Sequence, residues 1–329
     1  MDEYIWGDVN RISPEAPVPV FEMTKERTGC GGAANVAQNI ISLGGKAKLV
    51  GVIGKDRDGE KLIQMLNLMG VGTADICMDV QRPTSKKTRV IVLSDTADFS
   101  HLNVDNTDDL SLHQGHHLLR IDRESKQEIT AMLRERLLSA VISHIAEVDA
   151  IIFSDYDKGV VSAELIKAVV MRAESYDIPI IVDPKRNNFW KYEGVTALTP
   201  NHKEAGEAVQ EEITDVSHLI TVGEKILDRL SLRSLLITRE EEGMSLFHRD
   251  SDGTLQVEHL PPYSRKVTDV TGAGDTVAAV FTLALAAQID CRSAAKLSSL
   301  AGGIVVGKMG CATATPEELH QAIETLPQT

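Results

Sequence analysis

An aspartate in a glycine-rich turn is the residue whose type and position best suit chemistry. Residues 269–275 (DVTGAGD) lead directly into the apolar run 276–287, which has the composition of a buried helix. Small residues at a helix start leave several backbone N–H groups pointing at one place, and the helix dipole adds to them, so the turn predicts an anion site. Asp275 can then take a proton from a substrate hydroxyl while these amides hold a phosphoryl group. The alternative is a glycine turn whose aspartate only caps the helix.

Two further segments carry groups suited to a sugar and to a metal ion. Residues 31–37 (GGAANVA) open a helix in which the glycines permit close approach of a sugar, and Asn35 offers hydroxyls both a donor and an acceptor. Asn201 and Glu204, three residues apart after an apolar run, can organise Mg²⁺ and its waters. Taken alone, the first segment is also explained by tight helix–sheet packing and the second by helix capping.

The elements that position these groups alternate between helix-like and strand-like patterns. Residues 124–146 place apolar side chains at spacings of three and four, which predicts an amphipathic helix, and residues 162–174 predict another. Apolar runs separated by helices predict a mostly parallel sheet covered on both faces, with ligands beyond the carboxyl ends of its strands. The predicted strands are residues 148–153, 178–183, 195–199, 234–238 and 244–247, and polar residues recur at their ends: Asp155, Asp183, Lys185, Asn201 and Thr238.

Two segments do not follow this alternation. Residues 10–28 contain several prolines and an extended apolar stretch, and residues 84–122 contain strand-like runs in polar surroundings. Together they predict a small β-sheet attached to the main sheet as a lid. Because no repeat, linker or break in composition divides the chain, we expect residues 1–329 to form a single domain.

Composition excludes several classes of function. The 34 Lys and Arg against 48 Asp and Glu leave a net charge of −14, which argues against broad binding to nucleic acid or to an anionic membrane surface. The four cysteines form no CxxC pair, so reduced thiols are expected. The N-terminus has no apolar signal segment, and the most apolar run is too short to span a bilayer. We therefore expect a cytoplasmic protein.

Taken together, these residues resemble the ribokinase-like (PfkB) carbohydrate kinases. The family's two signatures match residues 31–45 and 269–275, and its Asn-x-x-Glu motif matches Asn201–Glu204. Within the family the chain looks like the D-glycero-β-D-manno-heptose 7-phosphate kinases, through residues 11–20 (RISPEAPVPV), 154–159 (SDYDKG), 183–185 (DPK) and 305–308 (VVGK). The resemblance covers essentially the whole chain and implies a three-layer α/β/α fold with a β-sheet lid. Family members begin with an apolar strand that is missing from the start of this sequence, so we expect either that this start lies within a longer protein or that the central sheet is incomplete.

The resemblance implies a reaction and a role for each matching residue. The reaction is ATP-dependent phosphorylation of the anomeric (C1) hydroxyl of D-glycero-D-manno-heptose 7-phosphate to the 1,7-bisphosphate, in ADP-heptose and lipopolysaccharide core biosynthesis. Asp275 is the implied base, with Gly272, Ala273 and Gly274 as the anion hole. The implied ATP-binding residues are Asn201, Glu204, Thr238, Gly243, Gly272 and Gly274, and Glu204 reaches Mg²⁺ through water. The implied substrate-binding residues are Asp2, Arg11, Gly31, Gly32, Asn35, Arg89, Arg120, Asp155, Lys158 and Lys185.

The resemblance also sets expectations for cofactors and partners. It implies ATP and Mg²⁺, leaves a monovalent cation open, and implies a homodimer formed through the lid strands. Many such kinases are fused to a C-terminal nucleotidyltransferase domain, and we expect none here, because little chain follows Pro316. Two alternatives remain: a kinase for another phosphosugar, and a catalytically silent regulator that binds a sugar or a nucleotide.

Overall fold

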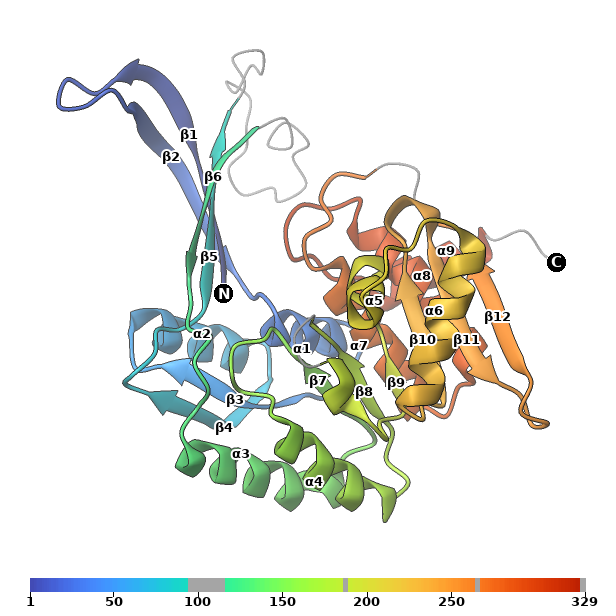
Figure 1. The fold of residues 1–329 in the computed structure, drawn as a ribbon. Coiled ribbons are helices and arrows are strands. Elements are labelled where there is room, and N and C mark those ends of the chain that lie inside the picture. The colour runs from blue at the N-terminus through green and yellow to red at the C-terminus, as the bar shows by residue number, and fades with distance from the viewer. Residues whose placement is uncertain (94–115, 186–188, 264–266, 326–329) are drawn as a thin grey trace.

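The core of the molecule is a six-stranded sheet with the strand order β12-β11-β10-β9-β8-β7 (Figure 1). The computed structural model describes residues 1–93, 116–185, 189–263 and 267–325. Strands β7 (Ile151–Ser154), β8 (Ile180–Asp183), β9 (Ala197–Leu198) and β10 (Ser234–Thr238) run parallel. Strands β11 (Met244–Arg249) and β12 (Leu255–Leu260) continue the sheet antiparallel. The predicted strands are therefore present and adjacent.

Helices cover both faces of this sheet. Neighbouring residues of a strand point to opposite faces, so Val182 packs with helices α4 (Ala163–Glu174) and α6 (Val216–Arg229), while Ile181 packs with helices α7 (Ala273–Ala286) and α8 (Cys291–Val305). Helix α5 (His202–Val209) packs against α6, and helix α9 (Pro316–Glu324) against α8. The predicted three-layer α/β/α architecture is confirmed. None of the helices in the described ranges is both long and apolar enough to cross a membrane.

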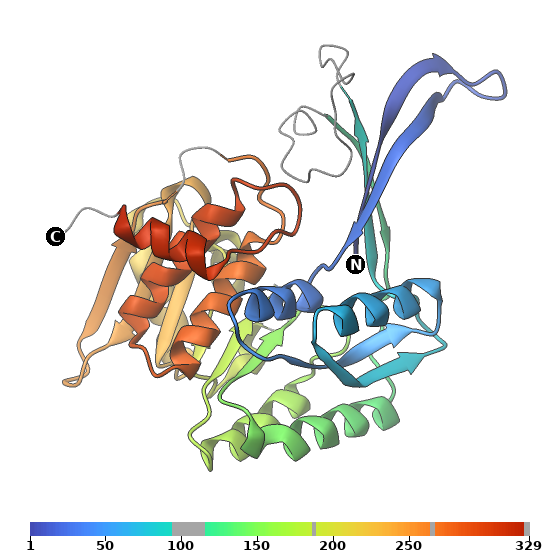
Figure 2. The ribbon, with the colours of Figure 1, turned by 180° about the vertical axis from the view of Figure 1, so that it is seen from behind.

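A second parallel pair lies beside the large sheet. Strands β3 (Lys48–Gly54) and β4 (Gly72–Asp79) pair only with each other among the described strands. Helices α1 (Ala33–Ser42) and α2 (Arg57–Leu68) lie on one side of this pair, and α3 (Ala131–His144) lies on the other (Figures 1 and 2). The described parallel strands thus form two separate groups.

The lid is a four-stranded sheet with the order β2-β1-β5-β6, which projects away from the rest of the molecule (Figure 1). Strands β1 (Asp2–Ile12) and β2 (Pro19–Gly29) form a hairpin, β5 (Lys86–Val92) runs parallel to β1, and β6 (His116–Arg123) runs antiparallel to β5. The lid is confirmed, but it begins at Asp2 and not near residue 10. The prediction missed these residues although Asp2, Tyr4 and Trp6, at a period of two, bury one face of the strand. Residues 94–115 of the predicted lid lie outside the described residues.

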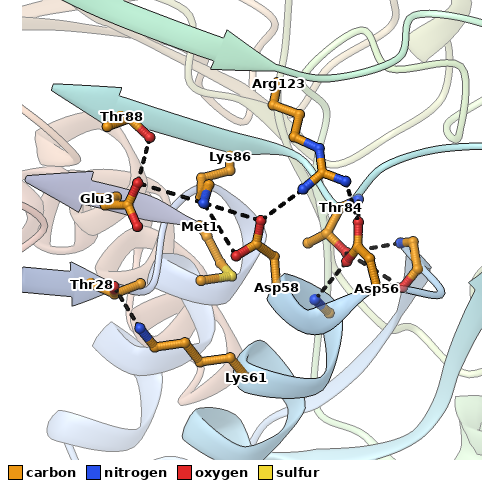
Figure 3. A network of polar contacts seen from close by, with 12 residues as sticks. Met1, Glu3, Thr28, Asp56, Asp58, Lys61, Thr84, Lys86, Thr88 and Arg123 are labelled. Atoms are coloured by element: carbon orange, nitrogen blue, oxygen red, sulfur yellow. Dashed lines mark hydrogen bonds and ion pairs between the residues drawn. The ribbon is translucent and has the colours of Figure 1, made fainter.

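A network of charged side chains ties the base of the lid to helix α2 (Figure 3). Lys86 of β5 pairs with Glu3 of β1 and with Asp58 of α2, at 3.5 and 3.1 Å. Arg123 of β6 reaches Asp58 and Asp56, each at 3.1 Å. Asp56 also caps α2 by accepting a hydrogen bond from the Gly59 amide at 2.9 Å. The lid is therefore anchored at one end and projects from that anchor.

Candidate active site

Asp275 lies in the first turn of helix α7 and is only 3% exposed. Gly272 caps the helix with φ of 79°, a left-handed conformation that glycine adopts without strain. A Cβ at Gly272 would also lie 2.5 Å from Asn35 Nδ2, so the close contact with helix α1 requires glycine. The first amides of a helix have no intrahelical acceptor, and here they surround the same turn as the carboxylate. A buried carboxylate and a helix start suited to an anion are thus combined in one turn.

Two hydrogen-bond donors hold the Asp275 carboxylate. The Tyr156 hydroxyl donates to Oδ1 at 2.6 Å, and Asn35 Nδ2 donates to Oδ2 at 2.9 Å. Burial raises the pKa of Asp275 to about 6, although both hydrogen bonds favour the ionised form. A carboxyl with this pKa is ionised at neutral pH and remains basic enough to accept a proton.

Helix α1 is joined to helix α7 by a short chain of buried amides and hydroxyls. Asn39 Nδ2 donates to the Asn35 backbone carbonyl at 2.9 Å, and Thr276 Oγ1 donates to Asn39 Oδ1 at 2.9 Å. Asn35 and Asn39 are one helical turn apart and fully buried, so their side chains point from α1 toward α7. These hydrogen bonds between α1 and α7 fix the position of the Asn35 side chain relative to Asp275.

Gly31 and Gly32 make room for other residues of the site. A Cβ at Gly31 would overlap Asp2 Oδ2, and a Cβ at Gly32, where φ is 57°, would lie 3.2 Å from the Tyr156 ring. The sequence explains these glycines by the approach of a sugar. In the structure, the lack of a side chain at these glycines leaves space for Asp2 of the lid and for Tyr156, which follows strand β7.

Asp2 links the lid to the segment between helices α8 and α9. Its carboxylate pairs with Arg89 of β5 at 2.5 Å, and the Cys311 thiol donates to Oδ2 at 3.4 Å. Burial and the charge of Asp2 raise the pKa of Cys311, so the thiol stays protonated and can donate. A cavity of about 190 Å³ opens beside these groups, and its lining also includes Arg27 and Gln38. Asp2 therefore presents a carboxylate to this cavity, and its charge also raises the pKa of Asp275.

The cations predicted to bind the substrate phosphate differ in position, in exposure and in the residues they contact. Arg89 and Arg120 lie directly opposite each other on β5 and β6 and so share one face of the lid, but Arg120 is exposed and bonded to Asp122. Lys185 lies at the carboxyl end of β8, 5.5 Å from the centre of the Tyr156 ring. Lys158 follows strand β7 and forms an ion pair with Glu124. These four cations lie around the base of the lid and the ends of the parallel strands.

Two predicted substrate residues have other roles in the structure. Arg11 lies at the far end of β1, where it pairs with Glu22 at 3.6 Å, roughly 30 Å along the strand from Asp2 at about 3.3 Å per residue. Within one chain Arg11 does not reach the site. Asp155 is buried, and its Oδ2 binds Tyr192 and Lys191 at 2.7 and 2.6 Å. Its carboxylate thus joins strand β7 to the short helix η4 (Phe189–Tyr192).

Four of the predicted nucleotide residues lie at the ends of β9 and β10 (Asn201, Glu204, Thr238 and Gly243), and the other two, Gly272 and Gly274, lie at the start of α7. Asn201 and Glu204 form a capping box at the start of α5, with bonds of 2.8 and 3.0 Å between each side chain and the other's backbone amide. Asn201 also forms a β-bridge with Thr238. Gly243 closes the turn into β11 with φ of 83°, where a Cβ would overlap the Leu260 carbonyl. Asn201 and Glu204 therefore do cap helix α5, which was the alternative to metal binding. The capping also keeps both residues at the strand ends.

Glu204, Lys185 and Asp183 form a charged group at this edge of the sheet. Glu204 Oε1 pairs with Lys185, and its Oε2 accepts from the Asn201 amide, so both oxygens already have a donor. Burial raises the pKa of Asp183 well above its usual value, although Lys185 acts in the opposite direction. The described residues contain no cluster of three metal-ligating side chains. Glu204 is therefore suited to contact a metal ion through water.

Three residues near the site were not predicted to belong to it. Tyr156 bonds to Asp275, and Asn39 supports Asn35. Lys87, from strand β5, places its amine 5.9 Å from the centre of the Tyr156 ring. Signals existed for two of them: Tyr156 follows a predicted strand end, and Asn39 lies four residues after Asn35. Lys87 gave no such signal, because only the pairing of β5 with β1 brings it to the site.

Comparison with known proteins identifies the family. A model described as pfkB family carbohydrate kinase matches residues 3–318, so the chain belongs to this family. The resemblance inferred from the sequence is confirmed.

Particular relatives are also similar over most of this chain. It is 41% identical over 319 residues to the bifunctional protein HldE of Geobacter metallireducens, which covers 97% of this chain and 60% of that protein. It is 40% identical to the bifunctional protein HldE of Geobacter sulfurreducens, with the same coverage. The chain thus spans about three-fifths of the length of these curated relatives.

Solved structures agree on the fold. Escherichia coli phosphofructokinase-2 in complex with substrates and products superposes with a TM-score of 0.71 at 18% identity, covering 98% of this chain and 95% of that one. Arabidopsis thaliana ribokinase complexed with ribose and ATP gives 0.70 at 15% identity, covering 99% and 96%. At these identities the likeness concerns the fold, which is ribokinase-like.

Proposed function

We propose that the chain transfers the γ-phosphoryl group of ATP to the anomeric hydroxyl of D-glycero-D-manno-heptose 7-phosphate, giving the 1,7-bisphosphate. The observation that carries the proposal is the buried Asp275 carboxylate, held by Asn35 and Tyr156 at a glycine-capped helix start. The RISPEAPVPV run and the similarity to the HldE relatives support heptose 7-phosphate as the acceptor. The product suits ADP-heptose and lipopolysaccharide core biosynthesis in the cytoplasm, with residues 1–329 acting as one kinase domain.

In this mechanism Asp275 removes the proton of the anomeric hydroxyl as that oxygen attacks the γ-phosphorus in line with the departing ADP. The amides of Gly272, Ala273 and Gly274 offset the charge that develops on the transferred group. The pKa of about 6 keeps Asp275 ionised at neutral pH and therefore ready to accept the proton. Burial around the carboxylate limits access of water, which would otherwise compete as the acceptor.

The nucleotide would lie over the ends of β9 and β10. Thr238 and Gly243 flank the turn after β10, and Asn201 and Glu204 begin the neighbouring helix. Glu204 would contact Mg²⁺ through water, since both of its oxygens already accept hydrogen bonds. When bound, Mg²⁺ neutralises charge on the transferring phosphates. A monovalent cation stays an open part of the proposal.

The sugar phosphate would bind between the base of the lid and the start of helix α1. Asp2, Asn35 and the glycines Gly31 and Gly32 would meet hydroxyls, because Asp2 lines the cavity, Asn35 bonds to Asp275, and the two glycines lie against Asp2 and Tyr156. The phosphate would bind to a set of cations through charge-assisted hydrogen bonds. This set consists of Arg89, Arg120, Lys158 and Lys185, with Lys87 as an addition that came from the structure.

We also propose a homodimer formed through the lids. Large apolar side chains are exposed on the lid strands and on the connection between β1 and β2, where a second lid would bury them: Ile12, Val18, Met23, Leu118, Leu119 and Ile121. Exposed apolar groups gathered on a projecting sheet are typical of an interaction surface. Such a dimer would also give Arg11, which is remote from its own site, a partner surface.

The deciding experiment is an ATP-dependent phosphorylation assay on a panel of sugar phosphates, with the position of the new phosphate read by phosphorus NMR. We expect heptose 7-phosphate to be the preferred acceptor and the new phosphate to lie on the anomeric carbon. Preference for a fructose or tagatose phosphate would favour the alternative of another phosphosugar kinase. ATP binding without turnover on any sugar would favour a silent regulator.

A further inference from the structure

Tyr156 contacts the base directly, and no step of the proposed reaction assigns it a role. Its hydroxyl lies 2.6 Å from Asp275 Oδ1, which is a short, charge-assisted hydrogen bond. Asn35 occupies the other carboxylate oxygen at 2.9 Å. The two donors come from different elements, the segment after β7 and helix α1, so together they define the orientation of the carboxylate.

The tyrosine can only donate in this contact. Burial and the neighbouring charge of Asp275 raise the pKa of Tyr156 well above 10, so its hydroxyl keeps its proton at any pH at which a kinase works. A permanently protonated donor favours the ionised form of its acceptor. The contact therefore stabilises the charged Asp275 carboxylate and does not compete with it for a proton.

The surroundings hold the Tyr156 ring in place. The ring packs on Gly32, and the amines of Lys87 and Lys185 lie 5.9 and 5.5 Å from its centre. These cations come from the lid and from the end of β8, so three parts of the molecule meet at one side chain. The ring is thus set between the lid and the main sheet.

Asp155 holds the segment that carries Tyr156. Its Oδ1 accepts from the Asp157 amide at 2.8 Å, while Tyr192 and Lys191 bind its Oδ2. Asp157 has a φ of 55°, so the chain turns sharply just after Tyr156. A buried carboxylate with these partners fixes the direction in which the tyrosine leaves the strand. The predicted sugar ligand Asp155 is therefore better explained as the support of Tyr156.

Several elements around Asp275 present charged or titratable groups to it. Asp2 of β1 and Asp183 of β8 oppose its ionisation, whereas Lys185 favours it. Cys311, before helix α9, stays a neutral thiol. In the described residues, only Tyr156 and Asn35 donate hydrogen bonds to the Asp275 carboxylate. They are therefore the direct contacts that counter burial.

We propose that Tyr156 is a positioning residue for the base: its hydroxyl orients the Asp275 carboxylate and holds it in the ionised form, and Asp155 fixes the segment from which Tyr156 projects. This proposal rests on Asp275 being the base of a sugar kinase. It adds a second part to that site, the segment after β7, which acts on the reaction only through Asp275. The expected consequence is an effect on kcat and on its pH dependence, with little effect on binding of either substrate.

The test is the Tyr156→Phe variant, which keeps the ring between Gly32 and the two lysines but removes the donor. We expect kcat to fall about tenfold or more, and the acid limb of kcat/KM against pH to move up by roughly one unit. The KM values for ATP and for the sugar phosphate should stay within about threefold. A fall in kcat with the acid limb unmoved would overturn the proposal, because a structural defect alone would produce it. An unchanged kcat would overturn it as well.

Tyr4→Phe is the matched control. It removes a buried tyrosine hydroxyl that has no hydrogen-bond partner among the described residues, so the acid limb should stay in place. A carboxyl titration by carbon-13 NMR, with the Asp275 signal assigned through Asp275→Asn, provides a readout that needs no turnover. If the wild-type protein phosphorylates no sugar, the proposed function fails. The titration still decides the role of Tyr156, because Tyr156→Phe must raise the midpoint for Asp275 if the proposal holds.

Discussion

The buried surroundings of the Asp275 carboxylate oppose its ionisation. A base must be ionised to accept a proton, yet burial disfavours the charge and raises the pKa of this group to about 6. Hydrogen bonds from Tyr156 and Asn35 offset part of that cost. At the scale of single residues, the ionisation of the proposed base therefore depends on the balance between burial and two donors.

Replacing Asp275 by Asn removes the base but keeps the shape of the side chain. We expect Asp275→Asn to lower kcat by about 10²–10⁴-fold, because proton abstraction by a positioned carboxylate contributes that much. The Kd for ATP, measured by calorimetry, should change little, since the nucleotide residues Asn201 and Thr238 lie on other elements. A kcat near that of the wild type would exclude Asp275 as the base.

The same substitution has a predicted effect on stability that depends on pH. The folded-state pKa of Asp275 is raised from 3.8 to about 6, so the folded protein binds this proton more tightly than the unfolded chain. The wild type therefore loses stability as the pH rises through that interval, by up to about 3 kcal/mol for a shift of this size. Asparagine cannot ionise, so the free energy of unfolding of Asp275→Asn should increase relative to that of the wild type between pH 4 and 7. Urea unfolding at several pH values measures this gain, and a difference that does not vary with pH would contradict it.

At the scale of elements, the lid depends on a junction with helix α2 (Figure 3). Asp56 is central to that junction, because it caps α2 and also accepts hydrogen bonds from Thr84 Oγ1 and Arg123, at 2.7 and 3.1 Å. Partial burial opposes ionisation of Asp56, but these bonds outweigh it and lower its pKa. The stability that this carboxylate contributes is therefore present above its unfolded pKa of about 3.8 and is lost as the pH falls through the lower folded value.

Asp56→Ala should destabilise the protein by about 2–3 kcal/mol. About 1 kcal/mol comes from the lost helix cap, and the remainder from the bonds to Thr84 and Arg123. Asp215→Ala is the matched control, because Asp215 caps helix α6 from an exposed position through the His218 amide at 2.8 Å. The control should cost only about 1 kcal/mol in urea unfolding. Equal losses for the two variants would mean that the lid junction adds nothing to stability.

At the scale of the whole molecule, the projecting lid is the part that a second copy would cover. Leu119 and Ile121 point to the same face of β6, two residues apart, and are 56% and 51% exposed. A dimer through this face would bury both side chains and so remove them from water.

Leu119→Glu should convert the proposed dimer to a monomer, because a dimer interface would have to bury the new charge. Met132→Glu is the control: Met132 is 78% exposed on helix α3, away from the lid. Analytical ultracentrifugation should show a dimer for the wild type and for Met132→Glu, and a monomer for Leu119→Glu. A wild-type monomer at micromolar concentration would rule the dimer out.

The distribution of charge is also a property of the whole molecule. The net charge of −14 argues against a broad surface that binds a polyanion, yet the two proposed substrates are anions. The structure resolves this by gathering Lys87, Arg89 and Lys185 around the site. For the proposed substrates, the local concentration of cations would decide binding, and the total charge would not.

Much of the fold and of the site follows from local patterns in the sequence. The alternation of apolar strands and amphipathic helices predicts the layered sheet, because burial on both faces requires it. The glycine turn before Asp275 and the pair Asn201 and Glu204 are recognisable because their chemistry depends on spacing within a few residues. The sequence by itself therefore determines the fold class, and it also supplies the residues proposed as the base and as the nucleotide side of the site.

Only the tertiary structure decides how distant segments meet. Tyr156 and Asp275 are 119 residues apart, and Asn35 and Asp275 are 240 apart, yet both pairs form direct hydrogen bonds. Arg11 is separated from the site by the length of strand β1, whereas Lys87 reaches it through the pairing of β5 with β1. The direction of a side chain depends on strand register and on helix packing, and both are set by contacts between segments that are remote in the chain.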